Sequence, residues 1–281
     1  MLFSSRFSAI LKPLRCRNEQ QVKQMDSIIH QMLRIVSYVK RSFPRDPVPP
    51  FLAKPDEKIV YLFGPEHVRC VSEEQAVSST EEWLERLREK RLNKILMHIH
   101  TPVNNPQTAG YANAEAEGIF TVFENGAVSV WIPHASYDNS REKWTTTFSE
   151  TNWPFSQNDL PVHINPAEDF KSILIRIGQF AREIGFDHYA SVFRKSYALL
   201  TGEETPVIPD WMPDRSMLPT EDDWRLLLAA NNADVFGGMG SWNDSPPWVA
   251  HDLGREDEYH QLSHELYVQI RRMYLYAINH W

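Results

Sequence analysis

The two histidines at positions 98 and 100 have the spacing with which a β-strand can present metal ligands. Side chains two residues apart on a strand point to the same face, so His98 and His100 could bind one ion together. His134, Asp138 or His163 would complete the ligand set, because zinc and related ions take imidazole and carboxylate ligands. This spacing makes a metal-dependent hydrolase one hypothesis, although the chain lacks the alternating strand–helix pattern of a barrel hydrolase.

The other patterns that could perform catalysis are incomplete. His260 and His264 are one helical turn apart, but the sequence HQLSH lacks the glutamate that HExxH uses as general base. No G-x-S-x-G is present. The cysteines, Cys16 and Cys70, have no metal-site spacing, and we expect them to stay reduced. These gaps favour a binding protein over an enzyme, and no cofactor is expected.

The most distinctive stretch is AANNADVFGGMGSWND at residues 229–244, where a helix is expected to run into a glycine-rich turn. The turn lacks the GK[ST] ending of a phosphate-binding loop. It either closes the core or lets the backbone approach a ligand or partner closely, as glycine allows. The residues of this signature turn are Phe236, Gly237, Gly238, Met239, Gly240, Ser241, Trp242, Asn243 and Asp244.

The run ADVFGGMGSWND, followed by EYHQLSHELYVQI, resembles a C-terminal signature of uncharacterised bacterial proteins. We associate these proteins with the immunity side of polymorphic toxin systems. The resemblance covers roughly the last 60 residues. It implies a cytoplasmic immunity-type protein, or antitoxin, that binds a cognate toxin domain and blocks it.

Charge is unevenly distributed along a chain whose formal net charge is −8. Residues 1–45 hold nine Lys and Arg side chains against two acids, whereas residues 201–281 hold fourteen acids against five Lys and Arg. The acidic part would repel nucleic acid, which is bound through clustered cations. It would attract a basic protein such as a toxin with a basic surface. A third hypothesis is a structural or assembly protein that uses basic residues 1–45 as an anchor.

Three regions are candidates for the contact with a partner: the loop 101–118, the segment 131–153 and the acidic loop 201–223. Tryptophan concentrates binding energy at interfaces, and exposed acids would steer a basic partner. The candidate contact residues, chosen by residue type, are Trp131, Trp144, Trp153, Glu203, Glu204, Asp210 and Trp211.

Hydrophobic periodicity and turn residues predict the elements that must position these side chains. Asn125-Gly126 is a strong hairpin signal, and Thr220 with Asp223 resembles a capping box at the start of a helix. Helices are expected at about 19–42, 80–91, 166–185, 188–200, from 220, and 256–279. Strands are expected at 58–63, 67–71, 94–100, 119–123, 127–132 and 143–148.

This order of elements predicts an α+β fold with an N-terminal helix, a central mostly antiparallel sheet and a helical C-terminal third. Residues 1–50 would form a basic arm and helix, and residues 51–281 a single core with a possible sub-boundary near residue 165. No stretch has the run of about 18 apolar residues that a membrane helix needs. We therefore expect a cytoplasmic protein without a membrane or nucleic-acid partner.

Overall fold

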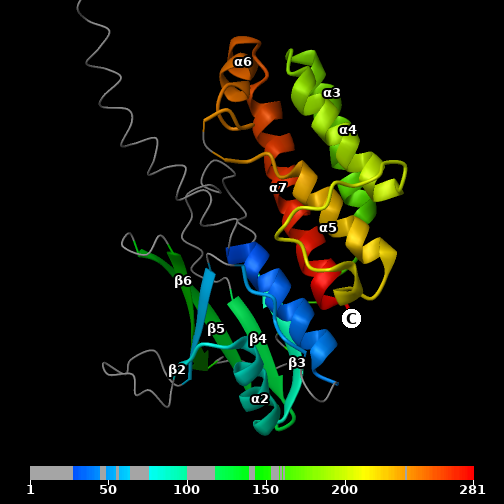
Figure 1. Ribbon diagram of the computed structural model, residues 1–281. Helices are drawn as coiled ribbons and strands as arrows, with labels where there is room; N and C mark the ends of the chain where they lie inside the picture. The colour runs from blue at the N-terminus through cyan, green and yellow to red at the C-terminus, as the bar shows by residue number, and fades with distance from the viewer. Residues whose placement is uncertain are drawn as a thin grey trace, which may run out of the picture.

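In the computed structural model, a six-stranded sheet lies beside a group of C-terminal helices, and the helix at residues 28–42 packs between them (Figure 1). The predicted class is confirmed, with an N-terminal helix, a mostly antiparallel sheet and a helical C-terminal region. The structure describes residues 28–44, 49–54, 57–63, 76–99, 118–138, 143–152, 158, 160, 162–237 and 239–281.

The strands occur in the order β2-β1-β6-β5-β4-β3 across the sheet. Neighbouring strands are antiparallel except β1 and β6, which run parallel. The predicted hairpin at Asn125-Gly126 is confirmed: it joins β4 to β5, and Gly126 has a φ of 82°. The bounds are β1 Glu57–Leu62, β2 Ala76–Val77, β3 Leu92–His98, β4 Gly118–Phe123, β5 Val128–Asp138 and β6 Lys143–Asn152.

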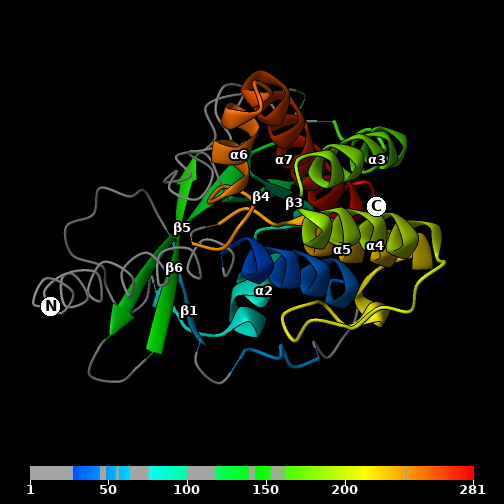
Figure 2. The ribbon, with the colours of Figure 1, turned by 90° about the horizontal axis from the view of Figure 1, so that it is seen from above.

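The C-terminal helices lie on the side of the sheet that ends in β3, far from β1 and β6 (Figures 1 and 2). α3 and α7 each carry a buried apolar stripe, as the periodicity predicts. Thr220 caps α5 by accepting a hydrogen bond from the Asp223 backbone N–H at 3.1 Å. The C-terminal helices are α3 Ala167–Glu183, α4 Asp187–Thr201, α5 Glu221–Ala233, α6 Pro246–Asp252 and α7 Glu256–Asn279, and an earlier helix, α2 Thr80–Glu89, lies between β2 and β3 in the chain.

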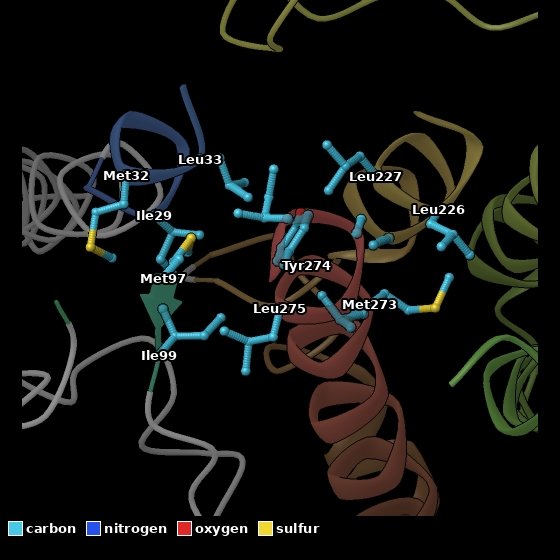
Figure 3. Close-up of a cluster of buried hydrophobic side chains, with 14 of the residues drawn as sticks. Ile29, Met32, Leu33, Met97, Ile99, Leu226, Leu227, Met273, Tyr274 and Leu275 are labelled. Atoms are coloured by element: carbon cyan, nitrogen blue, oxygen red, sulfur yellow. The ribbon is translucent and has the colours of Figure 1, made fainter. Parts of the chain in front are cut away.

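One contiguous apolar cluster joins the sheet to the helices through the helix at residues 28–42. In Figure 3, Ile29 and Leu33 of that helix lie close to Met97 on one side and Tyr274 and Leu227 on the other. Nearly every residue of this helix is buried, which is why it is apolar around most of its circumference. Burial of this surface supplies the main force that holds the sheet and the helices together.

A smaller apolar cluster lies apart from this core and is built from β3, β4 and β5. Alternation along a strand separates the two clusters, because successive side chains point to opposite faces. On β5, Val130 therefore belongs to the small cluster while its neighbour Trp131 belongs to the main core.

Asn279, near the end of α7, pairs directly with the outer edge of β3. Its Oδ1 accepts the Met97 N–H at 2.8 Å, and its Nδ2 donates to the Met97 carbonyl at 2.7 Å. An edge strand leaves such groups without a strand partner, and here a side-chain amide takes that place. The result is a hydrogen-bonded joint between residues 182 positions apart.

Several predicted bounds need adjustment. β5 continues to Asp138, beyond the expected end at residue 132, and β6 continues to Asn152. The short strand β2 and the short helix α6 were not predicted, since two and seven residues are too few to show a period. The strand expected at 67–71 and the first part of the helix expected at 19–42 lie outside the described residues.

Candidate functional site

The histidines do not form a metal site within the described part of the chain. β3 ends at His98, and His100 lies outside the described residues. No group of three or more His, Cys, Asp or Glu side chains among the described residues could hold a metal ion. His98 instead lies edge-on to Phe120, with ring centroids 5.7 Å apart, and His134 is exposed on β5. The described geometry therefore gives the metal-dependent hydrolase no support.

His163 takes part in the joint between the helices and the sheet. Its Nε2 accepts a hydrogen bond from Asn279 Nδ2 at 2.9 Å, so that nitrogen carries no proton. Burial, together with the neighbouring His98 and Lys94, lowers the pKa of His163 to about 4. This neutral, hydrogen-bonded histidine therefore has a structural role: it helps to hold Asn279 in place.

The pair His260 and His264 belongs to the surface of α7. His260 Nε2 lies 3.5 Å from a Glu256 carboxylate oxygen, and the other oxygen of that carboxylate lies 2.9 Å from His251 Nδ1. The hydrogen bond to Glu256 raises the pKa of His251. These contacts lie at the surface, where pairs of this kind contribute little to stability.

Two of the predicted contact tryptophans are core residues, so the predicted contact surface needs correction there. Trp131 is fully buried, donates from Nε1 to Thr121 Oγ1 at 3.1 Å and meets Tyr61 edge-on. Trp211 is also buried and stacks on His30 with ring centroids 3.6 Å apart. In this conformation neither indole is available to a partner.

The remaining tryptophan candidates lie on or beyond β6. Trp144 is half-buried, and its ring centroid lies 4.8 Å from that of Tyr137 on β5. Trp153 and the loop 101–118 lie outside the described residues, so contacts there stay predictions.

Three of the nine cations in residues 1–45 are used inside the fold, which weakens the anchor hypothesis. Arg34 forms an ion pair with Glu57 in which both side chains are buried. Lys40 donates to the Ile278 carbonyl at 2.6 Å, near the negative end of α7. Arg41 donates to a backbone carbonyl just before α5. The other six cations lie outside the described residues.

One predicted contact region is exposed: residues Glu203–Asp210, which we call the acidic segment. The sequence predicted its acidic residues but not its apolar ones. Glu203, Glu204 and Asp210 are exposed, and none of them forms an ion pair among the described residues. Between them project Val207 and Ile208, which are 82% and 57% exposed. These two side chains were missed, although two β-branched apolar residues between prolines in an acidic loop are a usable signal.

Both ends of the acidic segment are fixed. At one end the backbone N–H groups of Glu203 and Glu204 donate to the Ala198 carbonyl at 2.8 and 3.2 Å, continuing from the last turn of α4. At the other end Met212 N–H donates to the Pro209 carbonyl at 3.0 Å, and the following side chains are buried. Two half-buried prolines also restrict the backbone of the segment. The exposed side chains are therefore presented on a constrained loop.

The signature turn is held at its base by Trp242. The Trp242 N–H donates to the Val235 carbonyl at 3.0 Å, and the indole Nε1 donates to Ser263 Oγ at 2.7 Å. The Tyr259 hydroxyl donates to the Trp242 carbonyl at 2.9 Å. Trp242 is fully buried and belongs to the main core.

An aromatic cage surrounds this indole. Phe180, Tyr189, Phe193 and Tyr259 from three helices all have ring centroids within 6.4 Å of the Trp242 ring. Phe180, Tyr189 and Phe193 meet the indole edge-on, and such contacts add to the stabilisation from buried area. The turn is therefore attached to α3, α4 and α7 at once.

The apex of the signature turn is exposed to solvent. Met239 is 75% exposed, and two residues of the adjoining α6 region, Trp248 and Leu253, are 73% and 55% exposed. Gly240, next to Met239, has a φ of 79°, a conformation that favours glycine. The base of the turn thus closes the core, which is one of the two roles that the sequence left open, and its apex is exposed. Gly238 lies outside the described residues.

Comparison of the chain with protein-family models, with curated proteins and with solved structures found no match. No described helix has the length and apolar character needed to cross a membrane.

Proposed function

We propose that this chain is an immunity-type protein that binds a cognate toxin domain and blocks it, using the acidic segment as part of the contact. The observation that carries the proposal is the pairing of exposed Val207 and Ile208 with exposed acids at Glu203, Glu204 and Asp210. Buried apolar side chains supply most of the affinity of an interface, and surrounding charges speed capture of an oppositely charged partner. The expected partner is a protein with a basic surface.

The constrained backbone of the acidic segment supports this proposal. A loop that must become ordered on binding loses conformational entropy, which reduces the affinity. Here the hydrogen bonds at Glu203, Glu204 and Met212 hold both ends before any partner arrives. The resemblance of the signature turn to immunity proteins of polymorphic toxin systems is a second, separate line of support. Such proteins act in the cytoplasm, where we place this one.

Co-expression with the partner tests the function directly. The tagged chain is isolated from its host, and each protein that co-purifies is expressed alone and together with the chain. The proposal expects a partner that stops growth alone and is harmless beside this protein at a fixed stoichiometry. If every co-purifying protein is harmless on its own, the immunity function is wrong.

Charge reversal on the acidic segment then tests the contact. Glu204→Lys should slow association and weaken its dependence on salt, whereas Glu89→Lys, an exposed acid on α2, should have little effect. Val207→Asp should speed dissociation by about tenfold or more, since about 1.4 kcal/mol corresponds to a factor of ten. Unchanged rates for both Glu204→Lys and Val207→Asp would remove the acidic segment from the contact while leaving the function itself intact.

A further inference from the structure

We propose that the apex of the signature turn and the adjoining α6 region form a second interaction surface, which binds a protein segment that carries apolar side chains beside lysine or arginine. We call it the signature surface and define it by Met239, Trp248 and Leu253. It goes beyond the contact proposed for the acidic segment, and it stands on different residues.

Exposure of these three side chains is the first argument. Met239, Trp248 and Leu253 are 75%, 73% and 55% exposed, and all three fall within one stretch of fifteen residues. Isolated apolar residues on a surface are ordinary, but a local group of large ones marks an interaction site. Tryptophan and methionine are also enriched at interfaces, because they supply large contact areas.

The rigidity of the turn beneath Met239 is the second argument. The Gly240 N–H donates to the Asp244 carboxylate at 2.8 Å, and the Tyr189 hydroxyl donates to the Gly240 carbonyl at 2.8 Å. Together with the caged Trp242, these bonds fix the backbone that directly follows Met239. The exposure of Met239 is therefore imposed by a built turn, and a partner would meet a side chain whose backbone is already ordered.

Charge decides the kind of partner. Asp252 and Asp257, one and four residues from Leu253 in the chain, are exposed and form no ion pair among the described residues. The nearest cation along the chain, Arg255, is already paired with Glu183 and Glu258. Two copies of this chain would bring like charges together, which costs affinity. A segment with lysine or arginine beside its apolar side chains would instead pair with the free acids.

The signature surface and the acidic segment lie at opposite ends of α4. Tyr189, near the start of this helix, binds Gly240, and Ala198, near its end, accepts the hydrogen bonds from Glu203 and Glu204. Fifteen helical residues span about 22 Å at 1.5 Å per residue. Figure 1 likewise places α6 at the outer end of the helical part. A variant in one surface therefore leaves the other in place.

The test uses the full chain and a synthetic amphipathic helical peptide of leucine and lysine, with a leucine–glutamate peptide of the same length as its control. Calorimetry should show saturable binding of the Leu/Lys peptide, weakened about tenfold or more in the Met239→Ser/Trp248→Ser variant. The matched control, Val162→Ser/Ile164→Ser, removes the same kind of exposed side chain outside both the signature surface and the acidic segment, and it should change the affinity less than about twofold. All four positions are exposed, so circular dichroism should confirm that both variants fold.

Equal binding of the Leu/Lys peptide to the two double variants would overturn the proposal, as would equal binding of the two peptides to the unaltered chain. Sedimentation that shows a dimer of the unaltered chain and a monomer of Met239→Ser/Trp248→Ser would also overturn it, because the occupant would then be a second copy. None of these results depends on a toxin. Failure of the immunity function is thus distinguished from failure of the signature surface.

Discussion

Replacing Asn279 with alanine tests whether the joint between α7 and β3 holds the two halves of the fold together. The side-chain amide hydrogen-bonds both the backbone N–H and the backbone carbonyl of Met97, at 2.8 and 2.7 Å, and Asn279 is only 4% exposed. Alanine removes both partners at once. The Met97 N–H and carbonyl would then be buried against the end of α7 without the hydrogen-bonding group that Asn279 supplies.

The expected cost follows from the number of groups left without a partner. A buried donor or acceptor that loses its hydrogen bond costs about 1–3 kcal/mol, so the pair predicts a loss of roughly 2–6 kcal/mol in the free energy of unfolding. The lost bond to His163 adds to this. Asn279→Asp should be equally harmful, because it keeps the acceptor for Met97 N–H but sets a carboxylate oxygen against the Met97 carbonyl.

Urea denaturation followed by both circular dichroism and tryptophan fluorescence measures this cost. Asn93→Ala is the matched control, since Asn93 lies exposed on the same strand and should change stability by less than about 0.5 kcal/mol. A loss in Asn279→Ala that is no larger than the loss in Asn93→Ala would refute the reasoning. It would show that apolar packing alone joins the sheet to the helices.

Three further predictions concern other parts of the fold. Burial lowers the pKa of His30 from 6.5 to about 3, so as pH falls the unfolded state binds a proton before the folded state does, and stability decreases from pH 6.5 toward pH 3. His30→Phe should therefore reduce the difference in unfolding free energy between pH 7 and about pH 5. An unchanged difference would contradict this reasoning. Gly202→Ala should lower stability by about 1–2 kcal/mol in thermal unfolding, because φ is 79° and the new Cβ would meet the Arg225 guanidinium. Gly126→Ala is the control, because Gly126 has a φ of 82° but open space around the added Cβ, so it measures the backbone strain alone. An equal loss of stability in both variants would show that the contact with Arg225 contributes nothing. Trp242→Phe should cost about 1–3 kcal/mol in urea unfolding through a lost buried hydrogen bond and a void, and a stability equal to the unaltered chain would show that the cage repacks without cost.

Local signals in the sequence determined much of the secondary structure. The apolar stripe from Tyr259 to Ala277 predicted α7 with the bounds that the structure shows. Thr220 and the Asn125-Gly126 pair located a helix start and a hairpin, because each acts on backbone groups within a few residues. Such interactions need no knowledge of the rest of the chain.

The contact residues of the candidate site were predicted less well, because exposure depends on what the rest of the chain covers. Tryptophan is suited to interfaces and to cores alike, so residue type could not place Trp131 or Trp211, and both proved buried. Val207 and Ile208 would fit a core by type, yet they project into solvent. The acids of the acidic segment were found, since charged side chains are rarely buried wherever the chain folds.

The sequence by itself determined which residues share a face of each strand or helix, and only the tertiary structure decided which faces are covered. Alternation on β5 separates Val130 from Trp131, but the helices that pack over one face of the sheet make Trp131 part of the main core. In the same way, nothing near Asn279 or Met97 in the sequence indicates that they pair, because they are 182 residues apart. Periodicity comes from backbone geometry within a few residues, whereas burial and pairing arise when distant segments meet.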